Sequence, residues 1–170
     1  AVFLADIPAY PKLLAITDAA VNIAPDLSAK AAILQHAIDL MATIGVDLPK
    51  AAILSAVETV NPLISSSLDA AALSVMSHRG QVRGALVDGP LAFDNAISLK
   101  AAEVKGIASP VAGDADILLV PDLVSGNILA KNLEYMADAT LAGLVLGLNA
   151  PIVLPSRADP VDARLVFFFF

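Results

Sequence analysis

The sequence predicts an α/β fold in which a mainly parallel sheet is flanked by helices. Short apolar runs of strand length alternate with amphipathic helical stretches along most of the 170 residues. This alternation is typical of a parallel sheet whose two faces are covered by helices. The hydrophobic fraction of 58% and the mean hydropathy of +0.78 fit strands that are buried on both faces, and the length allows one sizeable core.

The strands are predicted from short apolar runs bounded by turn residues. Phe3–Ile7 and Leu13–Thr17 are joined by Pro8-Ala9-Tyr10-Pro11, so we expect them to form an antiparallel pair at an edge of the sheet. Four further buried strands are predicted over Lys50–Val57, Gly84–Val87, Asp116–Val120 and Leu141–Leu146. A last short strand, Ile152–Leu154, follows a crossing point in the Gly- and Pro-containing stretch 147–151.

Helices are predicted between these strands. The stretch Ser28–Ile44 carries apolar residues on one helical face and stops at Gly45, a residue suited to the end of a helix. Ser66 and Asp69 have the spacing of a capping box, which starts a helix running to Arg79. The remaining helices are predicted over Leu91–Val104 and Ile128–Ala137.

The composition excludes several classes of function. The absence of Cys excludes disulfides, thiolate catalysis and Cys-based zinc sites. With 17 acidic against 10 basic residues, we expect no nucleic-acid partner. The longest apolar stretch, Leu141–Leu154, contains Asn149 and Pro151 and is shorter than the roughly 20 residues that span a bilayer. Asp6 interrupts the first apolar run, so no signal peptide is expected, and a cytoplasmic location fits.

Four strings place acids, amides, hydroxyls or cations where an apolar run ends. They are ITDAAVNIAP (16–25), VDGPLAFDNAIS (87–98), ILLVPDLVSGNILAK (117–131) and LPSRAD (154–159). In an open α/β sheet such junctions form the ligand crevice, so several of them pointing at one place predict a site. The sequence holds no Walker loop, G-x-G-x-x-G fingerprint, metal-spaced pair or Ser-His-Asp arrangement, and neither His36 nor His78 suggests a catalytic role.

The string LPSRAD makes the sharpest prediction. Ser156 and Asp159 are fully explained as a capping box for the next helix. Arg157 is not, because a cation in the first turn opposes the helix dipole at a cost of about 0.3–1 kcal/mol. An anionic ligand would reverse that sign, since helix N-terminal amides and a guanidinium both favour phosphate. Arg157 is therefore the first candidate for an anion-binding residue.

The other strings leave two interpretations open. Asp122 comes just after a buried strand, and Gly126 and Asn127 are expected at the entry to the next helix. They form either a loop in which Gly126 has an unusual conformation and Asn127 caps the helix, or a backbone nest for phosphate. Asp88 is expected at the C-terminal end of a strand and Asp94 one turn into a helix, although Asp-Gly-Pro is also an ordinary turn. Asp18 and Asn22 could likewise be loop caps or ligand contacts. Glu58, Thr59 and Asn61 could line the same crevice.

Taken in order, TDAAVNIAP, SAVETVNP, DGPLAFDNAIS, PDLVSGNILAK and PIVLPSRAD resemble successive motifs of the phosphate acetyl- and butyryltransferases, with the butyryl-like branch closest. The resemblance runs from about Phe3 to Leu165 and covers about the second half of a family member. It implies two α/β domains with the architecture of isocitrate and isopropylmalate dehydrogenases. Residues 1–147 would form most of the second domain, and residues 148–170 would return to a first domain whose bulk is absent.

The resemblance also implies an activity, which is acyl transfer between coenzyme A and inorganic phosphate through a ternary complex. By resemblance, Arg157 would hold the phosphate charge and Ser156 the developing oxyanion. Either Asp159 or Asp162 could be the base, because the Asp of acetyl-specific members falls on Ala163 here. A further departure follows Lys131. Acetyl-type members carry an active-site Arg soon after the matching Lys, whereas this chain continues with Asn132-Leu133-Glu134-Tyr135.

The implied partners are acyl-CoA, phosphate and acyl phosphate, in a homodimer without nucleic acid or membrane. No metal and no tightly bound cofactor are implied. We expect the half represented here to be inactive alone, and acetyl or butyryl specificity stays open. The alternative function is a non-catalytic domain for CoA sensing and dimerisation, similar to the one fused to malic enzymes.

Overall fold

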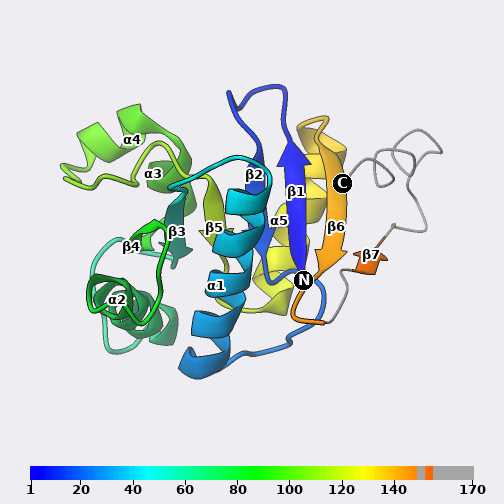
Figure 1. Cartoon of the computed structure of the whole chain (residues 1–170). Coiled ribbons are helices and arrows are strands. Elements are labelled where there is room, and N and C mark those ends of the chain that lie inside the picture. The colour runs from blue at the N-terminus through cyan, green and yellow to red at the C-terminus, as the bar shows by residue number, and fades with distance from the viewer. Residues whose placement is uncertain (149–151, 155–170) are drawn as a thin grey trace.

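A computed structural model describes residues 1–148 and 152–154. Its strands form one seven-stranded sheet in the order β4-β3-β5-β2-β1-β6-β7 (Figure 1). The strands are β1 (Val2–Asp6), β2 (Leu14–Thr17), β3 (Lys50–Leu54), β4 (Leu86–Leu91), β5 (Ile117–Leu119), β6 (Thr140–Val145) and β7 (Ile152–Leu154). The helices are α1 (Leu27–Thr43), α2 (Ser65–His78), α3 (Phe93–Ile97), α4 (Leu99–Val104) and α5 (Leu123–Met136).

The sheet is mixed, whereas the sequence predicts a mainly parallel one. The pairings β3–β4, β3–β5 and β2–β5 are parallel, and the pairings β1–β2, β1–β6 and β6–β7 are antiparallel. Strands β2 to β6 therefore point the same way, while β1 and β7 run against them. The carboxyl ends of β2, β3, β4, β5 and β6 consequently meet at one edge of the sheet, which we call the carboxyl edge.

Two helical layers cover the sheet. One buried cluster joins α1 and α2 to side chains such as Leu4, Ile53 and Leu144, and the other joins α3, α4 and α5 to side chains such as Ile16 and Leu118. Figure 1 shows α1 in front of the sheet and α5 behind it. Successive residues of a strand face opposite sides, so continuous apolar runs supply both cores at once.

The predicted antiparallel edge pair lies in the middle of the sheet. The register Val2↔Thr17 confirms that β1 and β2 pair antiparallel. However, β2 also pairs with β5, and β1 also pairs with β6 through Val2↔Leu144. The sequence pattern showed the local pair but carried no sign of the distant strand β6 that covers its open side.

Helix positions agree with the sequence better than helix caps do. The capping box predicted for Ser66 and Asp69 is wrong, because the N-cap of α2 is Ile64 and makes no side-chain cap bond. Asp69 instead forms an ion pair with the buried Lys30 at 2.6 Å, which ties α2 to α1. The single helix predicted over Leu91–Val104 is two short helices, since Ser98 ends α3 and caps α4.

Polar and charged side chains at the opposite edge of the sheet, where β3 and β5 begin, hold neighbouring segments together. The Tyr10 hydroxyl donates a hydrogen bond to the carbonyl oxygen of Ala115 at 2.6 Å. Lys12 forms ion pairs with Asp114 at 2.7 Å and with Asp116 at 2.8 Å. Burial, with the two carboxylates nearby, raises the pKa of Tyr10 to about 12. These bonds fasten the β1–β2 turn to the start of β5.

Candidate functional site

The loop after β2 is organised by the carboxylate of Asp18, which is only 2% exposed. It accepts hydrogen bonds from the backbone nitrogens of Ala20 at 2.9 Å and Val21 at 3.1 Å, and from the side-chain amide of Asn22 at 2.5 Å. Burial favours the neutral acid, but these three hydrogen bonds outweigh it, so the pKa of Asp18 is lowered. Asp18 and Asn22 therefore fold their own loop.

The next string forms the start of α5, directly after β5. Asp122 is the N-cap, and its carboxylate accepts a hydrogen bond from the backbone nitrogen of Ser125 at 2.8 Å. Gly126 and Asn127 lie inside the helix, so neither the cap by Asn127 nor an unusual glycine conformation is found. The absence of a side chain at Gly126 has a different explanation. A Cβ there would lie only 2.9 Å from the carbonyl oxygen of Asp18.

The string around β4 is divided between a strand and a helix. Asp88 lies in the middle of β4, opposite Ala52 of β3, and not at the strand's C-terminal end as the sequence predicts. Asp94 lies in α3 and forms an ion pair with Lys105 at 3.0 Å. The hydrogen bond from Lys105 lowers the pKa of Asp94.

A polar cluster beyond β3 and β4 includes residues that sequence reasoning ranked low or missed. The Asn95 amide is fully buried and donates to the carboxylate of Glu58 at 3.4 Å, which also lies 3.4 Å from Lys105. Within the described residues, the Oδ1 atom of Asn95 has no hydrogen-bond partner. Nothing in the sequence distinguished Asn95 from other helix-start amides.

The structure thus brings two groups of predicted residues to the carboxyl edge. One group is Asp18, Asn22, Asp122 and Gly126. The other is Asp94 with Glu58. The remaining predicted residues, Ser156, Arg157, Asp159 and Asp162, lie outside the described residues. The strand before them, β7, runs antiparallel to β6, so it points away from the carboxyl edge and does not end there with the other three strings.

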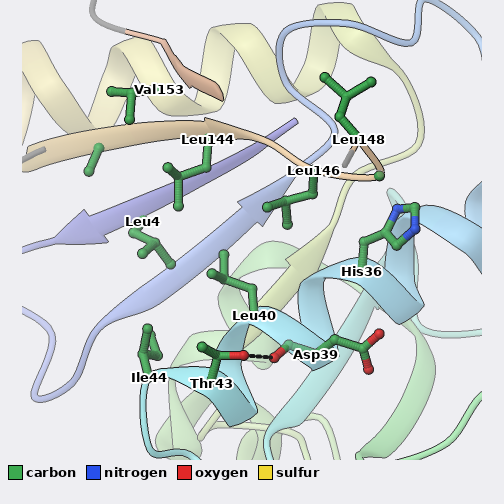
Figure 2. Close-up of a pocket in the computed structure, with 12 residues that line it drawn as sticks. Leu4, His36, Asp39, Leu40, Thr43, Ile44, Leu144, Leu146, Leu148 and Val153 are labelled. Carbon is green, nitrogen blue, oxygen red and sulfur yellow. Dashed lines mark hydrogen bonds between the residues drawn. The ribbon is translucent and has the colours of Figure 1, made fainter. Parts of the chain in front are cut away.

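Two cavities lie beside α1 and share part of their lining. The larger has a volume of about 700 Å³ and lies between α1, β1, β6 and β7 (Figure 2). The smaller, of about 260 Å³, reaches Thr17 and Asn22 at the carboxyl edge. His36, Leu146 and Gly147 line both. We call the two together the α1 groove, and it runs from the Asp18 loop to Val153 of β7.

The α1 groove is mostly apolar. Its larger part is lined by aliphatic side chains of three strands and of α1, together with His36, Asp39 and Thr43. Figure 2 shows Leu40 pointing toward the strands, whereas the Asp39 carboxylate points away from the aliphatic side chains. Gly147 has a φ of +85°, and a Cβ there would lie 2.9 Å from Cε1 of His36. His36, dismissed from the sequence, is therefore part of the groove.

Other kinds of site find no support among the described residues. Residues 1–148 and 152–154 contain no group of three or more His, Cys, Asp or Glu side chains placed to hold a metal ion. None of the helices described there has the length and hydropathy that crossing a membrane requires.

Comparison with known proteins identifies relatives along almost the whole chain. A family described as "Phosphate acetyl/butaryl transferase" matches residues 1–167. The phosphate acetyltransferase of Rickettsia prowazekii (strain Madrid E) is 60% identical over 165 residues, which are 96% of this chain and 47% of that protein. The probable phosphate butyryltransferase of Bacillus subtilis (strain 168) is 52% identical over 94% of this chain and 54% of its own length.

A solved structure agrees with the fold. A branched-chain phosphotransacylase from Enterococcus faecalis V583 superimposes with a TM-score of 0.89 and 37% identity, over 98% of this chain and 60% of that one. The chain spans about half the length of the curated relatives it matches.

Proposed function

Because the chain belongs to the phosphate acetyl- and butyryltransferase family, we propose that the protein of which it forms about half transfers an acyl group between coenzyme A and phosphate. Support comes from relatives named as phosphate acetyltransferases or phosphate butyryltransferases, whose matches cover 92–96% of this chain. The family match implies acyl-CoA, phosphate and acyl phosphate as the ligands. The proposed reaction involves no tightly bound cofactor.

The α1 groove is the structural observation that carries this proposal. One end of the groove reaches Asn22, a residue predicted to contact substrate, and the other end reaches Val153. Val153 precedes Ser156 by only three positions in the sequence. The groove therefore runs from the carboxyl edge to β7, which is the last described strand before the proposed catalytic string in the sequence.

In the proposed reaction, an oxygen of phosphate attacks the thioester carbonyl carbon, and the carbon–sulfur bond breaks to release the CoA thiolate. Arg157 would neutralise the phosphate charge, and Ser156 would donate a hydrogen bond to the oxyanion that develops on the carbonyl. In reverse, the thiol must lose its proton to Asp159 or Asp162. An ordinary thiol pKa is about 8.5 and an Asp pKa about 3.9, so burial must raise the acid's pKa or the proton must move within the transition state.

The proposal extends to the organisation of the whole protein. Residues 1–147 would form a second α/β domain of the isocitrate dehydrogenase-like architecture, and residues 148–170 would return to a first domain. The protein would be a cytoplasmic homodimer. These points rest on the family match and on the share of the relatives' length that the chain covers.

Substituting Arg157→Ala in the full-length protein tests the proposed function. We expect acyl phosphate formation from acetyl-CoA and butyryl-CoA, trapped as the hydroxamate, to fall at least a hundredfold. The fall is expected because the phosphate loses its counter-charge in a site where such a group is worth several kcal/mol. Arg79→Ala, at the exposed end of α2, is the matched control and should keep the wild-type rate.

Two results would contradict the proposal. An unchanged rate in Arg157→Ala would remove Arg157 from the site. A wild-type protein that binds CoA but makes no acyl phosphate from either substrate would be a CoA-sensing domain and not an acyltransferase.

A further inference from the structure

We propose that the outward-facing side of α5 is the centre of the surface through which two copies of this protein pair. The homodimer belongs to the proposed function, on which this inference rests, and what is new is the surface and the geometry of the contact. The proposal is carried by the exposure, the charge and the symmetry of one helix.

One side of α5 packs on the sheet, and the other side is exposed and rich in apolar side chains. Gly126 and Ala130 are buried on the inner side, whereas Ile128 is 57% exposed and Tyr135 is 64% exposed. Residues three or four positions apart are neighbours on a helix, so the exposed side chains form one continuous stripe. Contiguous exposed apolar surface is typical of a protein–protein contact. We define the outer face of α5 as Asn127, Ile128, Lys131, Asn132, Tyr135 and Met136.

The charge of the outer face favours a second copy of the same chain. The chain has 17 acidic and 10 basic residues, so two copies repel each other when they approach at random. The outer face has no acidic residue, and its one cation, Lys131, pairs with Glu134 of the same helix at 3.0 Å. Two copies therefore meet little repulsion at this face. A Tyr and a Met among few charges are also typical of the centre of an interface.

The pattern of the outer face is complementary to itself. In a two-fold interface the same patch meets its own copy, so residue i contacts j and residue j contacts i. The exposed positions are symmetric about the bond between Lys131 and Asn132, because 127 and 136, and also 128 and 135, are equally distant from it. Two α5 helices that cross antiparallel at this bond would place Ile128 of one copy against Tyr135 of the other.

The Tyr135 ring is held in place for such a contact. The Lys131 ammonium lies 5.5 Å from the centroid of the ring, within the range of a cation–π interaction. A large aromatic side chain whose position is already restricted loses little freedom on binding, which is what an anchor residue of an interface requires.

Pairing through the outer face leaves the proposed ligand sites open. Because α5 connects the parallel strands β5 and β6, it runs back from the carboxyl edge to the opposite edge of the sheet. Tyr135 and Met136 therefore lie at the end of the helix that is far from the carboxyl edge. The helix also covers the face of the sheet opposite to α1 (Figure 1), so a partner on α5 does not block the α1 groove.

The substitution Ile128→Glu in the full-length protein tests the surface. The position is exposed in one copy and glutamate is a good helix former, so the variant should fold. In the dimer the new carboxylates would lose water without gaining a partner. We expect the dissociation constant of the dimer, measured by sedimentation velocity over a dilution series, to rise at least a hundredfold. Val75→Glu is the matched control, because Val75 is also 57% exposed and lies within α2.

A second variant tests the antiparallel crossing. Tyr135→Lys should also weaken the dimer by itself. Mixing it with Ile128→Glu should restore pairing, because the crossing sets the new lysine of one copy against the new glutamate of the other. Recovery of a dimer only in the mixture is the expected result, and it is independent of how well either variant alone forms a dimer.

Three results would overturn the inference. They are a monomeric wild-type protein, equal dissociation constants for Ile128→Glu and Val75→Glu, and a mixture that stays monomeric. An intact dimer with a lower unfolding temperature in Ile128→Glu would show that another part of the same chain covers α5, which also overturns it. The hydroxamate assay on the wild-type protein tests the acyltransferase function separately, so an inactive protein that pairs through α5 would contradict only that function.

Discussion

Asp122 closes the first turn of α5. Its carboxylate accepts one hydrogen bond from the backbone nitrogen of Ser125 at 2.8 Å and a second from the Ser125 hydroxyl at 3.0 Å. A side chain occupied in this way stabilises the helix through a backbone nitrogen that would otherwise lack a partner. Its position after β5 is explained by capping without any ligand.

We predict that Asp122→Ala lowers the free energy of unfolding by about 1 kcal/mol, the usual cost of losing an N-cap. Asp122→Asn should restore most of that loss, because an amide oxygen accepts the same bond. Urea denaturation of both variants measures the difference. If Asp122→Asn were as stable as the wild type and yet raised the KM for acyl-CoA in the full-length protein, the carboxylate would be a ligand contact as well.

Single residues show where sequence reasoning succeeds and where it stops. The capped-loop interpretation puts the cap at Asn127, whereas α5 begins at Leu123 and Asp122 is its N-cap. The sequence offers Asp122 and Asn127 as possible caps and does not show where the helix begins. Asp69 had the spacing of a capping box, yet it pairs with Lys30, 39 positions earlier in the chain. Local spacing contains no information about such a distant partner.

At the scale of elements, α5 approaches the loop after β2 unusually closely. A Cβ on Gly126 would lie 2.7 Å from a methyl group of Val120 and 2.9 Å from the carbonyl oxygen of Asp18. Both distances are shorter than real Cβ contacts allow, and the oxygen belongs to the backbone. The helix can therefore lie where it does only because this position has no side chain.

We predict that Gly126→Ala destabilises the protein by up to about 2 kcal/mol. Overpacking costs about 1–3 kcal/mol, and the better helix propensity of Ala returns about 1 kcal/mol. Asn127→Ala, one position along on the exposed side of the helix, should change stability by less than about 0.5 kcal/mol. Equilibrium unfolding in urea compares the two, and equal stabilities would contradict the close packing.

The order of helices and strands along the chain was predictable from the sequence, whereas the pairing of distant strands in the sheet was not. Apolar runs and turn residues located six of the seven strands closely, because those signals are local. The strand predicted over Gly84–Val87 shares only Leu86 and Val87 with β4, which continues to Leu91 through a stretch that the sequence predicts as a turn. The position of β1 between β2 and β6, and the antiparallel direction of β7, depend on pairings between distant segments. Three of the four polar strings therefore lie at one edge of the sheet, in two separate groups, while the strand before the fourth string points to the other edge.

At the scale of the whole molecule, the α1 groove combines β1, α1, β6 and β7, which are separated by most of the sequence. No sequence motif marks it, and nothing in the sequence points to His36, which lines both of its cavities. The helical face that includes Ile44 was predicted, but the side chains beside it could be assigned to a cavity only once β6 was placed. The groove could be located only from the three-dimensional structure.

We predict that this chain alone forms no acyl phosphate, because it spans about half the length of its relatives and the cleft of the proposed enzyme needs both domains. The hydroxamate assay measures the acyl phosphate. Turnover by the chain alone at the rate of the full-length protein would contradict the need for a second domain.

The place of β1 also determines when the sheet can be completed during synthesis. Its Val2 can pair with Thr17 almost as soon as both have left the ribosome, but its other partner, Leu144, is made 142 positions later. Until then β1 has a row of unpaired backbone groups on an apolar strand, which is a template for intermolecular association. The nascent chain therefore remains vulnerable to aggregation until β6 is translated.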